Sequence, residues 1–144
     1  MKIAIAILAL AAATVADEVV YLVNCQHYTA NPNQPFTPIG SAMNYYADIS
    51  QSQNGQSPDA SSNYLTSGSY VQWEGAECDG YFPSSGVTFK SHIQGNGASL
   101  ATGAYAGSGN NGSPFNFYKD NGRSLWSTAE GGVDCHSIYY CRKN

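Results

Sequence analysis

Three histidines are the side chains of this chain best suited to acid–base catalysis. His27, His92 and His136 are its only imidazoles, and Glu74 and Arg123 add a carboxylate and a guanidinium. A metal-free secreted ribonuclease uses this set, because it pairs a carboxylate or histidine base with a histidine acid while an arginine neutralises the phosphate. The competing interpretation places the three histidines in separate hydrogen-bonded surface positions, which is the commoner situation for histidine. We favour a non-enzymatic protein and keep the hydrolase as an alternative.

Aromatic side chains give a stronger binding signal than the titratable residues. The chain has 11 Tyr, 5 Phe and 2 Trp among many Asn, Gln, Ser and Thr residues. Flat rings cover the apolar faces of a saccharide, while amides and hydroxyls bond its edges. A carbohydrate platform is therefore predicted at Tyr45, Trp73, Tyr118 and Trp126. The alternative is that these rings fill the core of a small sheet protein.

The turn residues and the aromatic segments predict the elements that position these side chains. Helix formers are scarce, and four Asn-Gly dipeptides, each a candidate type I′ turn, fall between segments rich in aromatic and β-branched residues. The pattern indicates an all-β, single-domain, disulfide-bonded antiparallel β-sandwich, with a Greek-key or crystallin-like arrangement as one form and at most one short helix within Ile39–Ile49. The expected strands are Glu18–Asn24, Met43–Ala47, Tyr70–Trp73, Gly80–Phe82, Val87–Ile93, Phe115–Lys119, Ser124–Ser127 and His136–Tyr140.

The cysteines predict two disulfides and no metal site. The four are even in number and include no Cys-x-x-Cys pair, and the histidine spacing supports no metal ligation, so neither a metal nor a cofactor is expected. If the first and last strands pair antiparallel with Leu22 opposite Ile138, then Cys25 lies opposite Cys135 on one face. Alternation along the first strand supports this, with Tyr21, Val23 and Cys25 on one face and Val20, Leu22 and Asn24 on the other. Three connectivities are open, and we predict Cys25 with Cys135 and Cys78 with Cys141.

The first sixteen residues are typical of a cleaved secretion signal. Lys2 precedes an apolar run from Ile3 to Ala13, and the small-residue pattern Thr14-Val15-Ala16 ends it. The run is too short to anchor a protein in a bilayer. We therefore expect residues 1–16 to be removed and residues 17–144 to form one secreted, extracellular domain, monomeric and without a membrane anchor.

Charge argues against nucleic acid as a general partner. From residue 17 onward the chain carries five Lys or Arg against ten Asp or Glu. Only Arg142 and Lys143 are adjacent, whereas binding to a phosphate backbone needs clustered cations. Nucleic acid is a partner only if the ribonuclease alternative holds.

Six segments in order along the chain carry a resemblance to other proteins: Val20–Cys25, Tyr45-Tyr46, Trp73–Gly75, Phe89–Ser91, Tyr118–Arg123 and Ile138–Cys141. Together they resemble a group of small secreted proteins of ascomycete fungi, of the effector or elicitor type. The resemblance implies a fungal source, release into host tissue and a role in virulence or plant immunity, and it carries no catalytic signature. We therefore predict a non-catalytic protein that binds a host protein or a cell-wall polysaccharide.

Two alternatives to the effector hypothesis remain. The acidic, Tyr- and Gly-rich composition is similar to that of small fungal guanyl-specific ribonucleases, although their Tyr-x-His and His-Thr-Gly-Ala motifs are absent. The second alternative is a carbohydrate-binding or crystallin-like antimicrobial domain, which requires Trp73 and Trp126 to lie coplanar on an exposed face.

Overall fold

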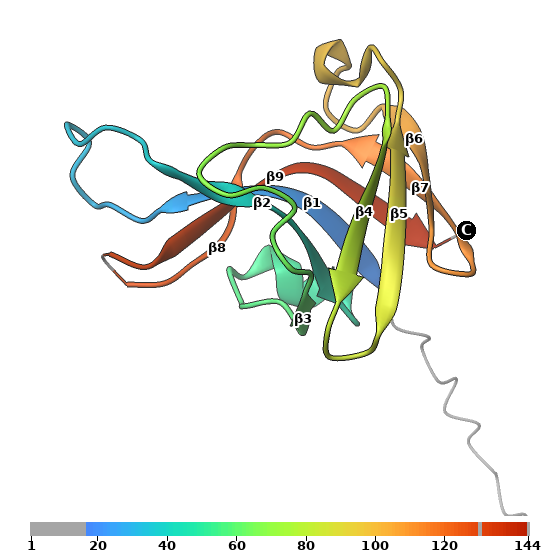
Figure 1. The fold of residues 1–144 in the computed structure, drawn as a ribbon, viewed down its shortest axis with the longest axis horizontal. Coiled ribbons are helices and arrows are strands. Elements are labelled where there is room, and N and C mark those ends of the chain that lie inside the picture. Colours follow the sequence, from blue (N-terminus) through green and yellow to red (C-terminus); the bar gives the residue numbers. More distant parts are fainter. Residues whose placement is uncertain (1–16, 130, 144) are drawn as a thin grey trace, which may run out of the picture.

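The strands of this chain form a single antiparallel sheet (Figure 1). The computed structural model describes residues 17–129 and 131–143, and the predicted secretion signal, residues 1–16, lies outside them. Two short 3-10 helices, η1 (Ile49–Gln53) and η2 (Gly97–Ser99), accompany the strands. The strands of the described chain are β1 (Val19–His27), β2 (Pro38–Tyr46), β3 (Ala60–Ser61), β4 (Glu77–Phe82), β5 (Val87–Ile93), β6 (Tyr105–Asn110), β7 (Pro114–Lys119), β8 (Ser124–Ser127) and β9 (Val133–Lys143).

The sheet curls almost into a closed barrel. Its strand order is β3-β2-β1-β9-β7-β6-β5-β4, and β8 pairs with part of β9 beside this path. At the seam, the chain after β3 meets the edge strand β4, where the Asn63 N–H donates to the Tyr81 carbonyl oxygen at 2.9 Å. The predicted all-β antiparallel fold is confirmed, and the predicted sandwich takes the form of one continuous sheet. Near-closure leaves little unpaired strand edge in the barrel.

Alternation along β1 builds two apolar clusters, one on each face of the sheet. Val20 and Leu22 point into the barrel, whereas Tyr21, Val23 and Cys25 point to its outer side, as their spacing predicts. The inner core comprises Val20, Leu22, Met43, Trp73, Cys78, Phe82, Phe89, Ile93, Ala106, Phe115, Phe117, Tyr139 and Cys141. The outer core comprises Val19, Tyr21, Val23, Cys25, Ala42, Tyr46, Leu125 and Cys135.

A β-bulge in β9 transfers side chains from the outer core to the inner core. Cys25 pairs with Cys135 as predicted, but Leu22 pairs with Tyr139, not Ile138, because the register shifts between Leu22 and Val23. The extra residue changes the parity of the strand. Cys135 therefore faces the outer core, and Tyr139 faces the inner core although it lies four residues further along.

The strand β6 is not predicted from the sequence, because its segment is rich in glycine. Its segment, Tyr105–Asn110, has two glycines and no β-branched residue. A Cβ at Gly109 would lie 2.6 Å from the Phe117 ring and 2.8 Å from the Phe89 ring, so inner-core aromatics occupy the space of a side chain. The predicted strand Tyr70–Trp73 is wrong, since this segment crosses the barrel end without joining the ladder.

Of the four Asn-Gly dipeptides, one joins a β-hairpin. Asn111-Gly112 lies between β6 and β7, which pair from Asn110 and Pro114 onward. Gly112 has a φ of 106°, but none of the non-glycine residues that the structure describes has a positive φ. The type I′ geometry, which needs a positive φ at both positions, is therefore not formed.

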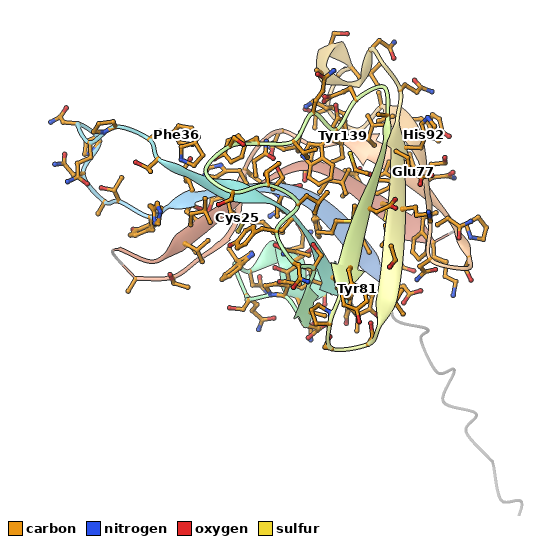
Figure 2. The ribbon with its side chains drawn as sticks, in the orientation of Figure 1. Cys25, Phe36, Glu77, Tyr81, His92 and Tyr139 are labelled. Carbon is orange, nitrogen blue, oxygen red and sulfur yellow. A yellow bond between two sulfur atoms is a disulfide. The ribbon has the colours of Figure 1, made fainter. Side chains whose placement is uncertain are left out.

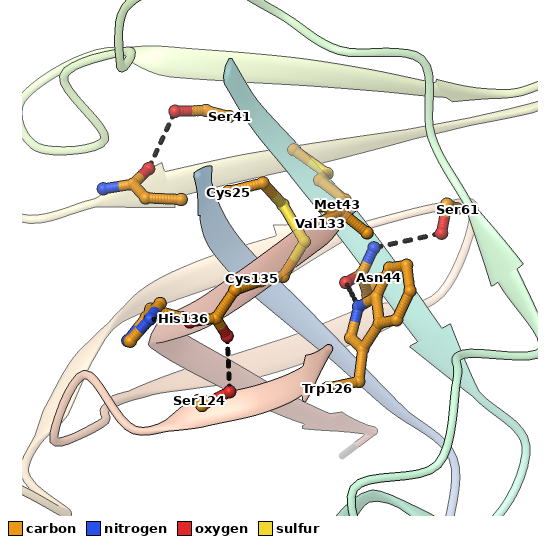
Figure 3. The surroundings of a disulfide bond; sticks show 12 residues. Cys25, Ser41, Met43, Asn44, Ser61, Ser124, Trp126, Val133, Cys135 and His136 are labelled. Atoms are coloured by element: carbon orange, nitrogen blue, oxygen red, sulfur yellow. Dashed lines mark hydrogen bonds and ion pairs between the residues drawn. A yellow bond between two sulfur atoms is a disulfide. The ribbon is translucent and has the colours of Figure 1, made fainter. Parts of the chain in front are cut away.

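The Cys25–Cys135 disulfide predicted from the register is confirmed (Figure 3). It joins directly opposed residues of β1 and β9, which are 110 residues apart in the sequence. Both half-cystines are buried in the outer core. The bridge therefore links the first and last strands of the sheet.

The second predicted bridge, Cys78 with Cys141, is not formed, and both residues are buried free thiols. Cys78 lies on β4 and Cys141 on β9, with β5, β6 and β7 between these strands in the sheet. The two thiols face the same inner core from separate walls of the barrel. Burial raises the pKa of each thiol, and most strongly that of Cys141.

Thiol titration tests this assignment. Because the thiolate is the reactive form and both free thiols are buried with raised pKa values, we expect the folded protein to be unreactive toward an aromatic disulfide reagent. The same protein unfolded without reductant should release two thiols per chain, and four after reduction. Absence of thiols in the unfolded, unreduced protein would show that the second bridge forms after all.

Candidate functional site

The structure separates the residues of the hydrolase hypothesis. His27 ends β1, His92 lies on the outer side of β5, and His136 lies on β9 opposite Asn24. The strands β6 and β7 lie between those carrying His92 and His136. No two of the three imidazoles share a site.

Arg123 is held on the outer side of the sheet by structural contacts. Its Nη1 donates to the Ser52 carbonyl oxygen at 3.2 Å and its Nη2 to the Tyr21 hydroxyl at 3.5 Å. Its Nε lies 3.8 Å from an Asp120 carboxylate oxygen, and the guanidinium lies 5.7 Å from the centroid of the Tyr21 ring. These contacts fasten η1 and the β7–β8 connection onto the outer core.

His136 has both ring nitrogens engaged with acceptors. Its Nδ1 lies 2.8 Å from the Gly122 carbonyl oxygen, and its Nε2 lies 2.9 Å from an Asp134 carboxylate oxygen. A ring bonded at both nitrogens has no free position for taking a substrate proton. Ser124 donates to the other oxygen of Asp134 at 2.5 Å, so the serine contacts the carboxylate and not the histidine. The group is therefore a strand-linking network and not a nucleophilic triad.

His92 lies opposite Glu77 in the β4–β5 pair (Figure 2), and Lys90 is two residues from it on the same side of β5. His92 and Lys90 line a shallow polar hollow of about 370 Å³ over the outer side of β5 to β7. The Lys90 ammonium lies 3.1 Å from Glu77 and 3.6 Å from Asp79, with all three side chains about half exposed. This hollow thus presents no uncompensated cation for a phosphate.

Glu74 accepts a hydrogen bond inside the upper end of the barrel. The Tyr139 hydroxyl donates to its Oε1 at 2.5 Å, and burial together with this carboxylate raises the tyrosine pKa. A Cβ at Gly97 would lie 2.8 Å from the Tyr139 oxygen, so η2 closes tightly over this pair. Glu74 is thereby a structural acceptor. Its backbone bridges Ile93, the neighbour of His92 on β5, but its carboxylate contacts Tyr139, whereas His92 points to the exposed outer side of that strand.

The four aromatic binding candidates do not form one platform. Trp73 is buried, with 2% of its surface exposed, and its indole N–H donates to Asn24 at 3.1 Å. Trp126 packs against the outer core and donates to Asn44 at 2.8 Å. Burial of Trp73 overturns the coplanar tryptophan platform, because the ring belongs to the inner core.

Tyr118 belongs to a row of tyrosines on the outer side of the sheet. Its ring stacks on Tyr140 at a centroid distance of 5.5 Å and an interplanar angle of 30°. The row continues from Tyr140 to Tyr21 at 6.3 Å, and Tyr105 meets Tyr118 edge to face at 6.3 Å. The rings therefore contact one another and do not present one flat surface.

Tyr45 lines a cleft at the end of the barrel where the β4–β5 hairpin lies, and this hairpin is at the lower end of the sheet in Figure 1. Its volume is about 380 Å³, within the usual range for small-molecule sites. Five segments meet there: the start of β1, the end of β2, the start of β3, the β4–β5 hairpin and the β6–β7 turn. The lining residues are Glu18, Val20, Tyr45, Asp59, Ala60, Phe82, Ser84, Ser85, Val87, Phe89 and Asn111.

Two carboxylates in this cleft were not singled out from the sequence. Glu18 Oε2 accepts from the Tyr45 hydroxyl at 3.0 Å, and Asp59 Oδ2 accepts from the Ala47 N–H at 2.8 Å. Burial raises the Tyr45 pKa, and Glu18 and Asp59 raise it further. The hydroxyl thus stays a donor, and both acids act on the same ring.

The described residues contain neither a cluster of metal ligands nor a membrane-spanning helix. Within residues 17–129 and 131–143, no group of three or more His, Cys, Asp or Glu side chains is arranged to hold a metal ion. In that same part of the chain, no helix has the length and apolarity needed to cross a membrane.

Comparison of the chain with models of protein families, with curated proteins and with solved structures gives no match.

Proposed function

We propose that this chain is a secreted fungal effector- or elicitor-type protein that acts without catalysis, by binding a host or cell-wall component in the cleft at the barrel end. The observation that carries the proposal is the position of Tyr45. This ring was a binding candidate on sequence grounds, and it lines an open cleft with an aromatic floor and a polar rim. Such a mixture suits a saccharide, whose C–H faces pack on rings while its hydroxyls bond polar groups.

The state of the titratable residues favours binding over hydrolysis. Hydrogen bonds within the fold occupy polar atoms of Arg123, His136 and Glu74. A hydrolase would need two such groups to converge on one substrate position. The hydrolase alternative thus has no site in which its residues act together.

Stability outside the cell fits the same role. The disulfide closes the first strand onto the last, and an oxidising compartment is where such a bridge persists. A nearly closed sheet with its terminal strands cross-linked resists local opening, which is the route by which proteases attack folded domains. These features support secretion without depending on a particular ligand.

A depletion assay with insoluble polysaccharides tests the proposal. Purified protein is mixed with chitin, cellulose or β-1,3-glucan, and the unbound fraction is measured after sedimentation. We expect Tyr45→Ala to weaken binding about tenfold, as expected for loss of an aromatic anchor. Tyr81→Ala is the matched control, because Tyr81 is 47% exposed and lies outside the cleft.

Plant leaf infiltration with the same proteins reports the host response. We expect cell death or defence output from the folded protein, retention by a His27→Ala, His92→Ala double variant, and loss in Tyr45→Ala. A response abolished by the double variant, together with unchanged polysaccharide binding by Tyr45→Ala, would contradict a non-catalytic cleft function.

A further inference from the structure

The lining of the cleft at the barrel end carries two carboxylates, and one of them, Asp59, has no cation paired with it among the described residues. Its lining includes Glu18 and Asp59 and no Lys, Arg or His residue. Asp59 is in no ion pair within the described chain, and its carboxylate is held in place by the Ala47 N–H. A positive group entering the cleft would therefore meet a fixed carboxylate whose charge no protein cation balances.

Both acids line the cleft next to Tyr45, because Glu18 contacts the tyrosine hydroxyl and the Asp59 backbone N–H donates to the Tyr45 carbonyl oxygen at 2.9 Å. Glu18 accepts a hydrogen bond from the Tyr45 hydroxyl, and both Glu18 and Asp59 raise the pKa of that hydroxyl through their charge, after burial itself. A cation near the Tyr45 oxygen would thus interact with both carboxylates. Charge-assisted hydrogen bonds to carboxylates are about twice as strong as neutral ones.

The rest of the lining suits a sugar ring. Phe82 and Phe89 are buried and form an apolar floor with Val20, with 5%, 2% and 3% of their surfaces exposed. The β4–β5 hairpin adds the hydroxyls of Ser84 and Ser85 at the rim. Rings for C–H faces, hydroxyls for sugar oxygens and carboxylates for a cation together describe a saccharide that bears an amine.

We propose that the cleft binds an amine-bearing saccharide, represented by a glucosamine oligomer, with an ammonium group between Glu18 and Asp59. This inference rests on the proposed binding function of the same cleft and names its ligand class. The N-acetylated sugar would bind less tightly, because the acetamide carries no positive charge to pair with the two carboxylates.

Lys143 is a built-in competitor for the ligand ammonium. Its Nζ lies 3.4 Å from Glu18 Oε1, with 52% of the lysine side chain and 29% of the glutamate side chain exposed. An exposed pair of this kind contributes little stability and is readily exchanged. Lys143→Met should therefore free Glu18 and tighten binding of the amino sugar about threefold.

Calorimetric titration tests the assignment with two probes, a short glucosamine oligomer and its N-acetylated counterpart of equal length, at a mildly acidic pH. We expect the amine form to bind at least about tenfold more tightly, with the difference shrinking at high salt as exposed charges are screened. Asp59→Asn and Glu18→Gln should each remove most of that preference. Glu77→Gln makes the same charge change at the far end of β4, roughly 17 Å away by strand rise, and should leave it unchanged.

The outcomes separate the inference from the function on which it depends. Equal binding of the two oligomers, unaffected by Asp59→Asn but weakened by Tyr45→Ala, would overturn the amine assignment and retain the cleft as a saccharide site. Binding of neither oligomer would overturn the inference, and the polysaccharide depletion assay would then decide the proposed function. A gain of affinity in Lys143→Met supports the inference without requiring any loss-of-function variant to fold.

Discussion

Replacing Cys25 and Cys135 together with alanine should lower the free energy of unfolding by about 4 to 5 kcal/mol. The bridge spans 110 residues, so it removes much of the freedom of the unfolded chain, and the chain-entropy model gives this magnitude for so long a loop. For a domain of this size, the loss is a large part of the whole stability. We expect the variant to be largely unfolded at temperatures at which the parent protein is native.

Urea denaturation followed by tryptophan fluorescence measures this effect. Cys78→Ala is the matched control, because it removes a buried thiol without breaking a bridge. The control should lose about 1 to 2 kcal/mol through the small cavity alone. A doubly substituted variant within 1 kcal/mol of the control would show that the paired strands hold β1 against β9 without help from the bridge.

The pairing of Cys25 with Cys135 was predictable because it depends on local periodicity. Alternation assigns each residue of β1 to a face, and only a few registers place a second cysteine opposite the first. The bulge near Ile138 was not predictable in the same way. An inserted residue leaves no local sequence signal here, yet it decides that Cys141 points into the inner core, away from the outer face of Cys135.

Burial of the aromatic residues shows a second limit of sequence reasoning. Trp73 and Tyr45 each follow an amide residue along the chain, yet Trp73 fills the inner core and Tyr45 lines a cleft. The difference arises where the chain crosses the barrel end, which depends on contacts with distant strands. The residue type therefore marks an aromatic side chain as a candidate for ligand binding. Whether a ligand can reach the ring depends on how the whole sheet folds around it.

The acids of the cleft were hidden for the same reason. Glu18 immediately precedes the first strand, and Asp59 immediately precedes the two-residue strand β3, 41 positions later in the sequence. Nothing in their spacing relates them, because the curl of the sheet brings β1 and β3 to one end of the barrel on either side of β2. The three histidines show the opposite case. Their residue type made them catalytic candidates in the sequence, but the strand order places them apart in the structure.

Gly107→Ala should be strongly destabilising, because at this position two strands approach more closely than any side chain allows. Gly107 has a φ of 155°, and a Cβ there would lie 2.0 Å from the His92 carbonyl oxygen and 2.9 Å from the Ile93 Cα. Both obstacles are backbone atoms of β5, so no rotamer change relieves the clash. The strands β5 and β6 would have to separate, and we expect a loss of about 2 to 4 kcal/mol.

Gly95→Ala is the control for this substitution, because a Cβ at Gly95 meets nothing within 4 Å and the residue has no positive φ. It should change stability by no more than about 0.5 kcal/mol, as for other unconstrained surface positions. Amide hydrogen exchange would locate the damage, with protection lost first in β5 and β6 and retained in β1 and β9, which the disulfide still joins. Equal stability of the two variants would mean that β5 and β6 can separate at no cost, and the tight approach at Gly107 would then not be what holds this wall of the barrel in register.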